Sequence, residues 1–211
     1  LKSLENSISV FVVNIVLKKN SFSYINRNFY VYDTKDVWGC MEYDDESWPK
    51  NYALFFSASS KSGGFAEGAT LMAYMKYEEV AQWADTFNTD SHENDRGESY
   101  RDFKKRKAEK LLDLMEVKFP DFRKHIHAYY AATPLSFRDY IGTDDGSMYG
   151  IVKDYNEPWR TFLSPRTKIS NLFFTGQNLN LHGILGVTFS ALVTCAELLG
   201  WEAVVGKIKK G

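Results

Sequence analysis

A glycine-flanked polar turn near the carboxyl end of this 211-residue chain has residue types that suit cofactor chemistry. The apolar run Asn171–Thr175 predicts a short strand that leads into Gly176. A helix is then predicted from Gly183 to Leu199, with Gly186 in its first turn. The first turn of a helix offers unpaired N–H groups and positive dipole potential, and glycines let a ligand approach the backbone. The pattern is typical of a cofactor-binding turn, although glycines at helix starts also serve close packing.

Motifs for other chemistries are absent from the sequence. It has no G-x-S-x-G nucleophile elbow, no phosphate-binding P-loop and no H-E-x-x-H metal motif. The dinucleotide fingerprint G-x-G-x-x-G is also missing, because the glycines at 62–68 lie between two predicted strands rather than before a helix. Cys40 and Cys195 stand far apart, so we expect neither a disulfide framework nor a metal site, and a reducing compartment is the simplest interpretation.

The composition is that of an ordinary folded protein with many aromatic side chains. Hydrophobic residues make up 44% and charged residues 25% of the chain. The 26 Lys and Arg balance 27 Asp and Glu, which argues against a nucleic-acid-binding protein. The 15 Phe, 13 Tyr and 5 Trp can fill a core and can also line a pocket for a bulky apolar ligand.

Predicted strands dominate the first part of the chain, and predicted helices follow them. Five runs rich in β-branched and aromatic residues predict strands, and a Gly/Ser loop at 57–68 joins two of them. Strands adjacent in sequence favour an antiparallel sheet with one face available to cover something. The predicted strands span residues 8–18, 29–33, 52–58, 69–76 and 125–132.

Three helices are predicted before the glycine-flanked turn. They cover 78–85, 98–118, and a short segment to Tyr140 for which Thr133 is the N-cap and Pro134 the first helical residue. The basic run Arg101–Lys110 on the long helix suits either an anion or membrane-surface patch or a solvated face. Interleaved acidic residues favour the solvated face.

Two charged or apolar stretches invite further interpretations. The acidic stretch 42–46 can bind a hard cation or remain a solvated loop, and the lack of a glycine-centred calcium loop favours the latter. Residues 183–200 are almost long enough to span a membrane, but Glu197 and several hydroxyls favour a buried helix instead.

The chain begins at Leu1 without a signal-peptide pattern. We therefore expect a cytoplasmic protein, with peripheral membrane contact through the basic run as an alternative.

The last third of the sequence resembles the retinol saturase and phytoene desaturase family of FAD-dependent flavoproteins. Residues 8–13 and 55–61 fit the same family more loosely, so the resemblance covers nearly the whole chain and is specific from Thr133 to Leu199. The matching motifs are TPL at 133–135, GSMYG at 146–150, NL at 171–172, TGQ at 175–177 and G-x-x-G at 183–186.

This resemblance implies an oxidoreductase that saturates or desaturates carbon–carbon bonds of apolar, retinoid-type or carotenoid-type substrates by hydride exchange with flavin. NAD(P)H is an expected electron donor. The resemblance makes Tyr149 and His182 candidates for the catalytic acid, although a hydrogen-bonded structural role suits His182 as well. The expected contacts to FAD are Thr175, Gly176, Gln177, His182, Gly183, Gly186 and Val187.

The resemblance also implies that this chain is the C-terminal portion of its family's architecture. We predict an α+β fold in which residues 1–165 form a substrate-binding domain and residues 166–211 complete an FAD-binding domain. The expected partners are an apolar small molecule, the N-terminal dinucleotide-binding half and a second copy of the chain. Without that half, the chain should hold no FAD and be inactive. The alternative is a non-enzymatic module that binds a lipophilic ligand or a protein partner.

Overall fold

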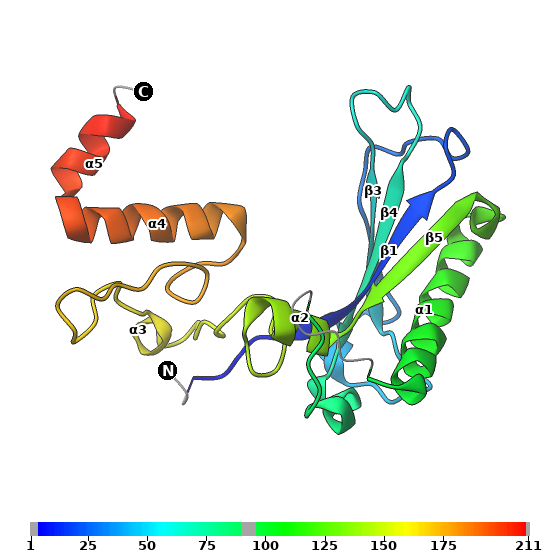
Figure 1. The fold of residues 1–211 in the computed structure, drawn as a ribbon, viewed down its shortest axis with the longest axis horizontal. Helices are drawn as coiled ribbons and strands as arrows, with labels where there is room; N and C mark the ends of the chain where they lie inside the picture. The colour runs from blue at the N-terminus through cyan, green and yellow to red at the C-terminus, as the bar shows by residue number, and fades with distance from the viewer. Residues whose placement is uncertain (1–3, 90–95, 210–211) are drawn as a thin grey trace. The chain divides into compact units, whose positions relative to one another are not determined.

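The chain folds into two compact units in a computed structural model that describes residues 4–89 and 96–209 (Figure 1). The sheet unit is Ile8–Gly146, and the C-terminal unit combines Ser147–Gly211 with Leu1–Ser7. The chain thus divides at the glycine-rich turn around Gly146, earlier than the predicted boundary between 165 and 166. The functions assigned to the two predicted domains remain predictions.

The sheet unit is α+β, as predicted, and all of its strand pairs are antiparallel. Within the described residues the sheet has five strands in the order β2-β3-β4-β1-β5. All five predicted strands are confirmed, and the Gly/Ser loop joins β3 to β4. The strands are β1 (Ser9–Leu17), β2 (Phe29–Tyr32), β3 (Asn51–Ser57), β4 (Gly68–Met75) and β5 (Ile126–Ala132).

One face of this sheet carries the core because alternate residues along each strand point to it. The long helix α1 (Glu98–Lys118), predicted with the same bounds, contacts β1 and β5 and lies beside β5 in Figure 1. Each fully buried aliphatic side chain contributes about 1.5–3 kcal/mol relative to exposure. The core includes Phe11, Val13 and Ile15 from β1, Leu54 from β3, Leu71 from β4, and Leu111, Leu112 and Met115 from α1.

Short helical segments complete the sheet unit. The helix α2 (Pro134–Ile141) begins at the predicted N-cap, where the backbone N–H of Leu135 donates to Thr133 Oγ1 at 3.2 Å. The helix predicted over 78–85 is wrong, because the chain forms two separate 3-10 turns at Tyr77–Glu79 and Ala81–Trp83. Val80, between them, has φ −116° and ψ 0°, which is not helical and interrupts the hydrogen-bond ladder.

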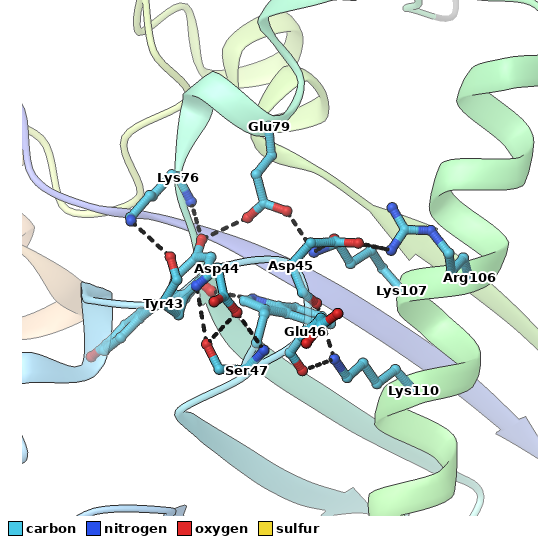
Figure 2. Close-up of polar contacts among 12 residues, drawn as sticks. Tyr43, Asp44, Asp45, Glu46, Ser47, Lys76, Glu79, Arg106, Lys107 and Lys110 are labelled. Atoms are coloured by element: carbon cyan, nitrogen blue, oxygen red, sulfur yellow. Dashed lines mark hydrogen bonds and ion pairs between the residues drawn. The ribbon is translucent and has the colours of Figure 1, made fainter.

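The basic run on α1 and the acidic stretch 42–46 contact one another (Figure 2). Asp45 and Arg106 remain exposed, in line with the predicted solvated surface, whereas Lys107 is buried and departs from it. Lys107 Nζ lies 2.5 Å from Glu79 Oε2 and 2.9 Å from Asp45 Oδ1, and its side chain is 0% exposed. Arg106 Nη1 lies 2.7 Å from Asp45 Oδ2. Lys110 Nζ donates to the backbone carbonyl of Glu46 at 2.6 Å. These contacts fasten the loop before β3 to the helix.

The C-terminal unit is built from three helices and irregular backbone. They are α3 (Pro158–Thr161), the predicted α4 (Gly183–Leu199) and α5 (Trp201–Ile208), which was not predicted. In Figure 1, α4 and α5 meet at an angle, and Gly200 between them has φ +85°, a conformation that favours glycine.

The strand predicted over 171–175 is wrong. Phe173 forms only an isolated bridge with Arg166. The neighbouring residues form a turn, in which the backbone N–H of Leu172 donates to the carbonyl of Ile169 at 3.1 Å. Thr167 Oγ1 also donates to the carbonyl of Leu172 at 2.9 Å, so the groups that a strand ladder needs are already paired locally.

Helix α4 is exposed over much of its surface, which corrects the prediction of a buried helix. Leu185 is 81% exposed, and Ile184 is more exposed still. The buried residues of α4 are Gly186, Ser190 and Ala196. In the part of the chain that the structure describes, we find no helix with both the length and the apolar character needed to cross a bilayer.

Candidate functional site

The amino end of α4 is open to a ligand. His182 is the N-cap residue, and no side chain within 4–89 or 96–209 caps the first turn. Gly176 and Gly183 have φ +107° and +75°, and a Cβ atom added to either would meet no atom within 4 Å. The backbone is therefore bare at both positions, and the uncapped N–H groups favour negative charge.

Gly186, one turn further along α4, serves packing. A Cβ atom at this position would lie 2.4 Å from the backbone carbon of Leu181. The turn before the helix therefore folds back against the first turn of α4 only because residue 186 has no side chain. The packing interpretation of helix-start glycines holds for Gly186, whereas Gly176 and Gly183 leave open space.

Asn180 in the same turn is a site residue that the sequence did not reveal. Its side chain is buried, and residue 180 as a whole is 7% exposed. Neither Nδ2 nor Oδ1 finds a hydrogen-bond partner among the residues that the structure describes. A buried amide without a partner costs about 1–3 kcal/mol, and native proteins satisfy nearly all such groups. The orphaned amide fits a polar group that the described residues do not supply.

Lys153 holds the turn in place from the other side. Its Nζ donates at 3.0 Å to each of three backbone carbonyls, those of Thr161, Asn178 and Leu179. Burial lowers the pKa of Lys153 from its usual value. The ammonium group thus joins two stretches of irregular backbone and fixes the path of the chain that leads to Asn180.

Tyr149 and His182, the two candidates for the catalytic acid, lie together. Their ring centres are 4.7 Å apart with an interplanar angle of 51°. The backbone N–H of Tyr149 donates to Ser7 Oγ at 3.1 Å, which places the Tyr149 ring on ordered backbone. A phenol and an imidazole side by side can donate and accept protons, so the pair has the chemistry of an acid–base site.

The remaining predicted FAD contacts differ in exposure. Thr175 and Val187 are exposed, and Gln177 is half-buried. All three belong to the segment around the α4 amino end, and their contact with FAD stays a prediction. Lys153 and Asn180 belonged to no motif, although Asn180 lies within the polar turn between Gly176 and Gly183 that the sequence singled out.

A second feature, in the sheet unit, is the sheet face opposite the core. The strand register places Phe55, Thr70, Asn14 and Tyr130 side by side in one row across four strands. Thr70 Oγ1 donates to Asn14 Oδ1 at 3.1 Å within this row. Tyr130, on the edge strand β5, is 67% exposed.

The next row across the same face is more apolar. It consists of Tyr30, Ala53, Met72, Val12 and Ala132. The Tyr30 ring packs edge-on against Phe55 of the first row, with ring centres 5.9 Å apart. Aromatic and aliphatic side chains with few polar groups suit one wall of a site for a bulky apolar ligand. On this face the side chains of β4 are partly exposed, and we call it the half-open face; that it covers something stays a prediction.

Comparison with known proteins identifies relatives of one kind. No family model matches the chain. All-trans-retinol 13,14-reductase of Danio rerio is 26% identical over 187 residues, which are 82% of this chain and 30% of that protein. The same enzyme of Rattus norvegicus is 23% identical over 216 aligned residues, covering 94% of this chain and 35% of that protein. The Homo sapiens protein matches over 107 residues at 26% identity, or 49% of this chain. The chain therefore spans about a third of the length of the first two relatives.

Proposed function

Because this chain is related in sequence to the retinol saturases, we propose that it is the substrate-binding and cofactor-closing part of an FAD-dependent oxidoreductase. The proposed enzyme saturates or desaturates carbon–carbon bonds in apolar, polyene-like substrates. The shared name of the relatives favours an oxidoreductase that acts on retinoids. The observation that carries the flavin part is the turn before α4, where bare glycine backbone, an uncapped helix end and an orphaned buried amide occur together.

These residues fit a large ligand with both anionic and polar groups. The bare backbone at Gly176 and Gly183 allows close approach, and the amino end of α4 favours negative charge. Asn180 offers one acceptor and two donor hydrogens at a buried position. FAD, when bound, supplies hydride exchange with the substrate, and the protein supplies orientation and electrostatics.

Tyr149 and His182 provide the accompanying proton in this proposal. Saturation of a double bond adds a hydride at one carbon and a proton at the other, so an acid must stand near the second carbon. The contact between the two rings lets one side chain orient the other. Saturation also consumes two electrons for each double bond, which an external reductant such as NAD(P)H must supply.

The half-open face of the sheet is the proposed substrate wall. A polyene has many apolar carbons, and each 100 Å² of apolar surface removed from water contributes about 2.5 kcal/mol. Tyr30, Phe55 and Met72 offer such a surface, whereas Asn14 and Thr70 offer one polar pair that can orient a terminal hydroxyl group.

The exposed apolar surface of α4 and α5 has a proposed partner as well. Ile184, Leu185, Trp201 and Ile208 are all exposed on these two helices. The relatives are about three times longer than this chain. We assign the covering surface to an N-terminal dinucleotide-binding half, which would complete the FAD site beside α4. Association of two copies of the chain is the competing occupant.

The experiment that tests this function is a visible absorption spectrum of protein purified from the full-length gene. We expect a flavin spectrum that bleaches with reductant, followed by conversion of a retinoid added without oxygen. The 211-residue chain alone should be colourless after mixing with FAD and gel filtration. A folded, colourless full-length protein that takes up no added FAD would contradict the proposal. It would favour the module that binds a lipophilic ligand or a protein partner.

A further inference from the structure

The basic run on α1 divides into two groups with different surroundings. Arg106, Lys107 and Lys110 are bound to the loop that contains Asp45 and Glu46. The cations nearer the amino end of α1 do not take part in those contacts. They line a separate cavity on the sheet unit, which we call the cationic cavity.

The cationic cavity has a volume of about 510 Å³ and lies where α1 meets the edge strand β5. Residues at i, i+1, i+4 and i+5 share one side of a helix, so the four lining residues from α1 act as a group. The residues that matter here are Arg96, Tyr100, Arg101, Lys104, Lys105 and Tyr129. No carboxylate lines this cavity within the described ranges.

Arg96 forms a fixed wall of the cationic cavity. It is buried, its guanidinium is ion-paired with Asp139, and its Nε donates to Thr86 Oγ1 at 2.7 Å. The centre of the guanidinium lies 5.2 Å from the centre of the Tyr100 ring. Arg96 is therefore held in place by Asp139, whose single negative charge it shares with Arg138.

Lys104 differs from Arg96 in its surroundings. Its Nζ lies 5.6 Å from the centre of the Tyr100 ring, and the structure gives it no ion pair with any described residue. Burial, and then the neighbouring Arg96, lower the pKa of Lys104. A partly buried ammonium group among other cations is stabilised by an anion that enters the cavity.

Tyr129 of β5 also lines the cationic cavity, and its hydroxyl is neutral and already donates its one hydrogen. Tyr129 Oη donates to Glu109 Oε1 at 2.7 Å, and burial followed by this hydrogen bond raises the pKa of Tyr129 to about 12. The other oxygen of Glu109 lies 2.7 Å from Arg123 Nη1, so that carboxylate is already paired. The cavity therefore combines a neutral hydroxyl group with several cations.

We propose that the cationic cavity binds a phosphate-type anion, with Lys104 as the main contact and Lys105 as a second contact. Its volume accommodates a phosphate together with the group that bears it. The same chemistry belongs to a soluble phosphate ester and to the headgroup of an anionic lipid. The proposal does not depend on the flavin function, because every residue in it lies in the sheet unit.

The test is calorimetric titration of the 211-residue chain with inorganic pyrophosphate at low salt. We expect saturable binding that Lys104→Met weakens by about tenfold or more and that Lys104→Arg retains. Lys118→Met, at the other end of α1, is the matched control and should bind like the unmodified chain. Circular dichroism of each variant confirms that the sheet unit is folded.

Vesicle sedimentation separates the two sources of the anion. Phosphatidylcholine vesicles with and without phosphatidate are compared, for the unmodified chain and for Lys104→Met. Loss of binding in the variant towards pyrophosphate supports a soluble ester, and the same loss towards phosphatidate vesicles supports a lipid headgroup. Two results would overturn the proposal: no saturable binding of either probe, or equal binding by Lys104→Met.

Discussion

The two units bury their apolar side chains to very different extents. In the sheet unit, α1 buries a continuous stripe, and Leu111 is 0% exposed. In the C-terminal unit, α4 is apolar on most sides, and Leu185 is 81% exposed. A helix that is apolar all round normally lies inside a larger assembly. The comparison therefore teaches that the sheet unit closes its own core, whereas we infer that the C-terminal unit is shaped for a surface outside this chain.

The largest expected effect comes from the same substitution made in each unit. Leu111→Ala should destabilise the sheet unit by about 2–5 kcal/mol, because it removes buried methyl groups and leaves a cavity. Leu185→Ala should change the stability of the chain by less than about 0.5 kcal/mol, because the side chain is already in solvent. Hydrogen exchange of the β1 amides measures the first effect. Equal losses in the two variants would break the comparison between the units.

A smaller loss is expected at the buried ammonium of the sheet unit. Lys107→Met should cost about 2–4 kcal/mol, since the ammonium group is fully buried and its removal takes a charged partner from Glu79, whose side chain is 18% exposed. Arg106→Met is the matched control, and it should cost about 1 kcal/mol or less because its pair with Asp45 is exposed. Urea unfolding of the two variants measures both values. A smaller loss for Lys107→Met than for Arg106→Met would show that the buried pair does not fasten the loop.

In the C-terminal unit, by contrast, a polar-to-apolar change should stabilise the isolated chain. Asn180→Leu removes an amide that lacks partners and should raise local stability by about 1–2 kcal/mol. Hydrogen exchange of the amides in α4 is the measurement. Asn156→Leu, at an exposed position in the same unit, should leave that exchange unchanged. Faster exchange in the Asn180 variant would mean that its amide already has a partner within the chain.

The smallest expected effect is a pH dependence confined to the sheet unit. Hydrogen bonds first from Arg106 and then from Lys107 lower the pKa of Asp45 to about 2. The folded state thus holds this proton less tightly than the unfolded state, so the contribution is complete above about pH 4 and is lost as the pH falls towards 2. Titration of the Asp45 carboxyl by NMR should show the low value and a rise in Arg106→Met. Arg160→Met, which removes the partner of Glu157, should leave the pKa of Asp45 unchanged.

Residue patterns predicted the elements that pack in the core of the sheet unit. The β-branched and aromatic residues of β1 and the apolar stripe on α1 predicted both elements, because both contribute side chains to a core within the same unit. The period-3.6 pattern of Trp201, Val204, Val205 and Ile208 could have revealed α5. The predicted burial of α4 was wrong. The hydropathy of a helix indicates that its apolar side chains favour burial, but it does not indicate whether the covering residues belong to the same chain.

Side-chain contacts between distant segments were beyond the sequence. Lys107 looked like one more solvated cation until the loop at Asp45 and the turn at Glu79 came together around it. Asn180 stands out because its buried amide has no hydrogen-bond partner among the described residues, and this depends on the tertiary structure. Tyr149 and His182 were separate candidates from the family resemblance, and the contact between their rings was not predicted.

The central claim is that the turn before α4 is completed by a flavin, and the most direct measurement is flavin retention by matched variants of the full-length protein. Asn180→Leu and Asn156→Leu are purified alongside the unmodified protein, and bound flavin is quantified by absorption after dialysis. We predict that Asn180→Leu loses its flavin, with affinity reduced by about tenfold or more, while the other two proteins retain it. Full retention by folded Asn180→Leu, or equal loss from both variants, would contradict the account.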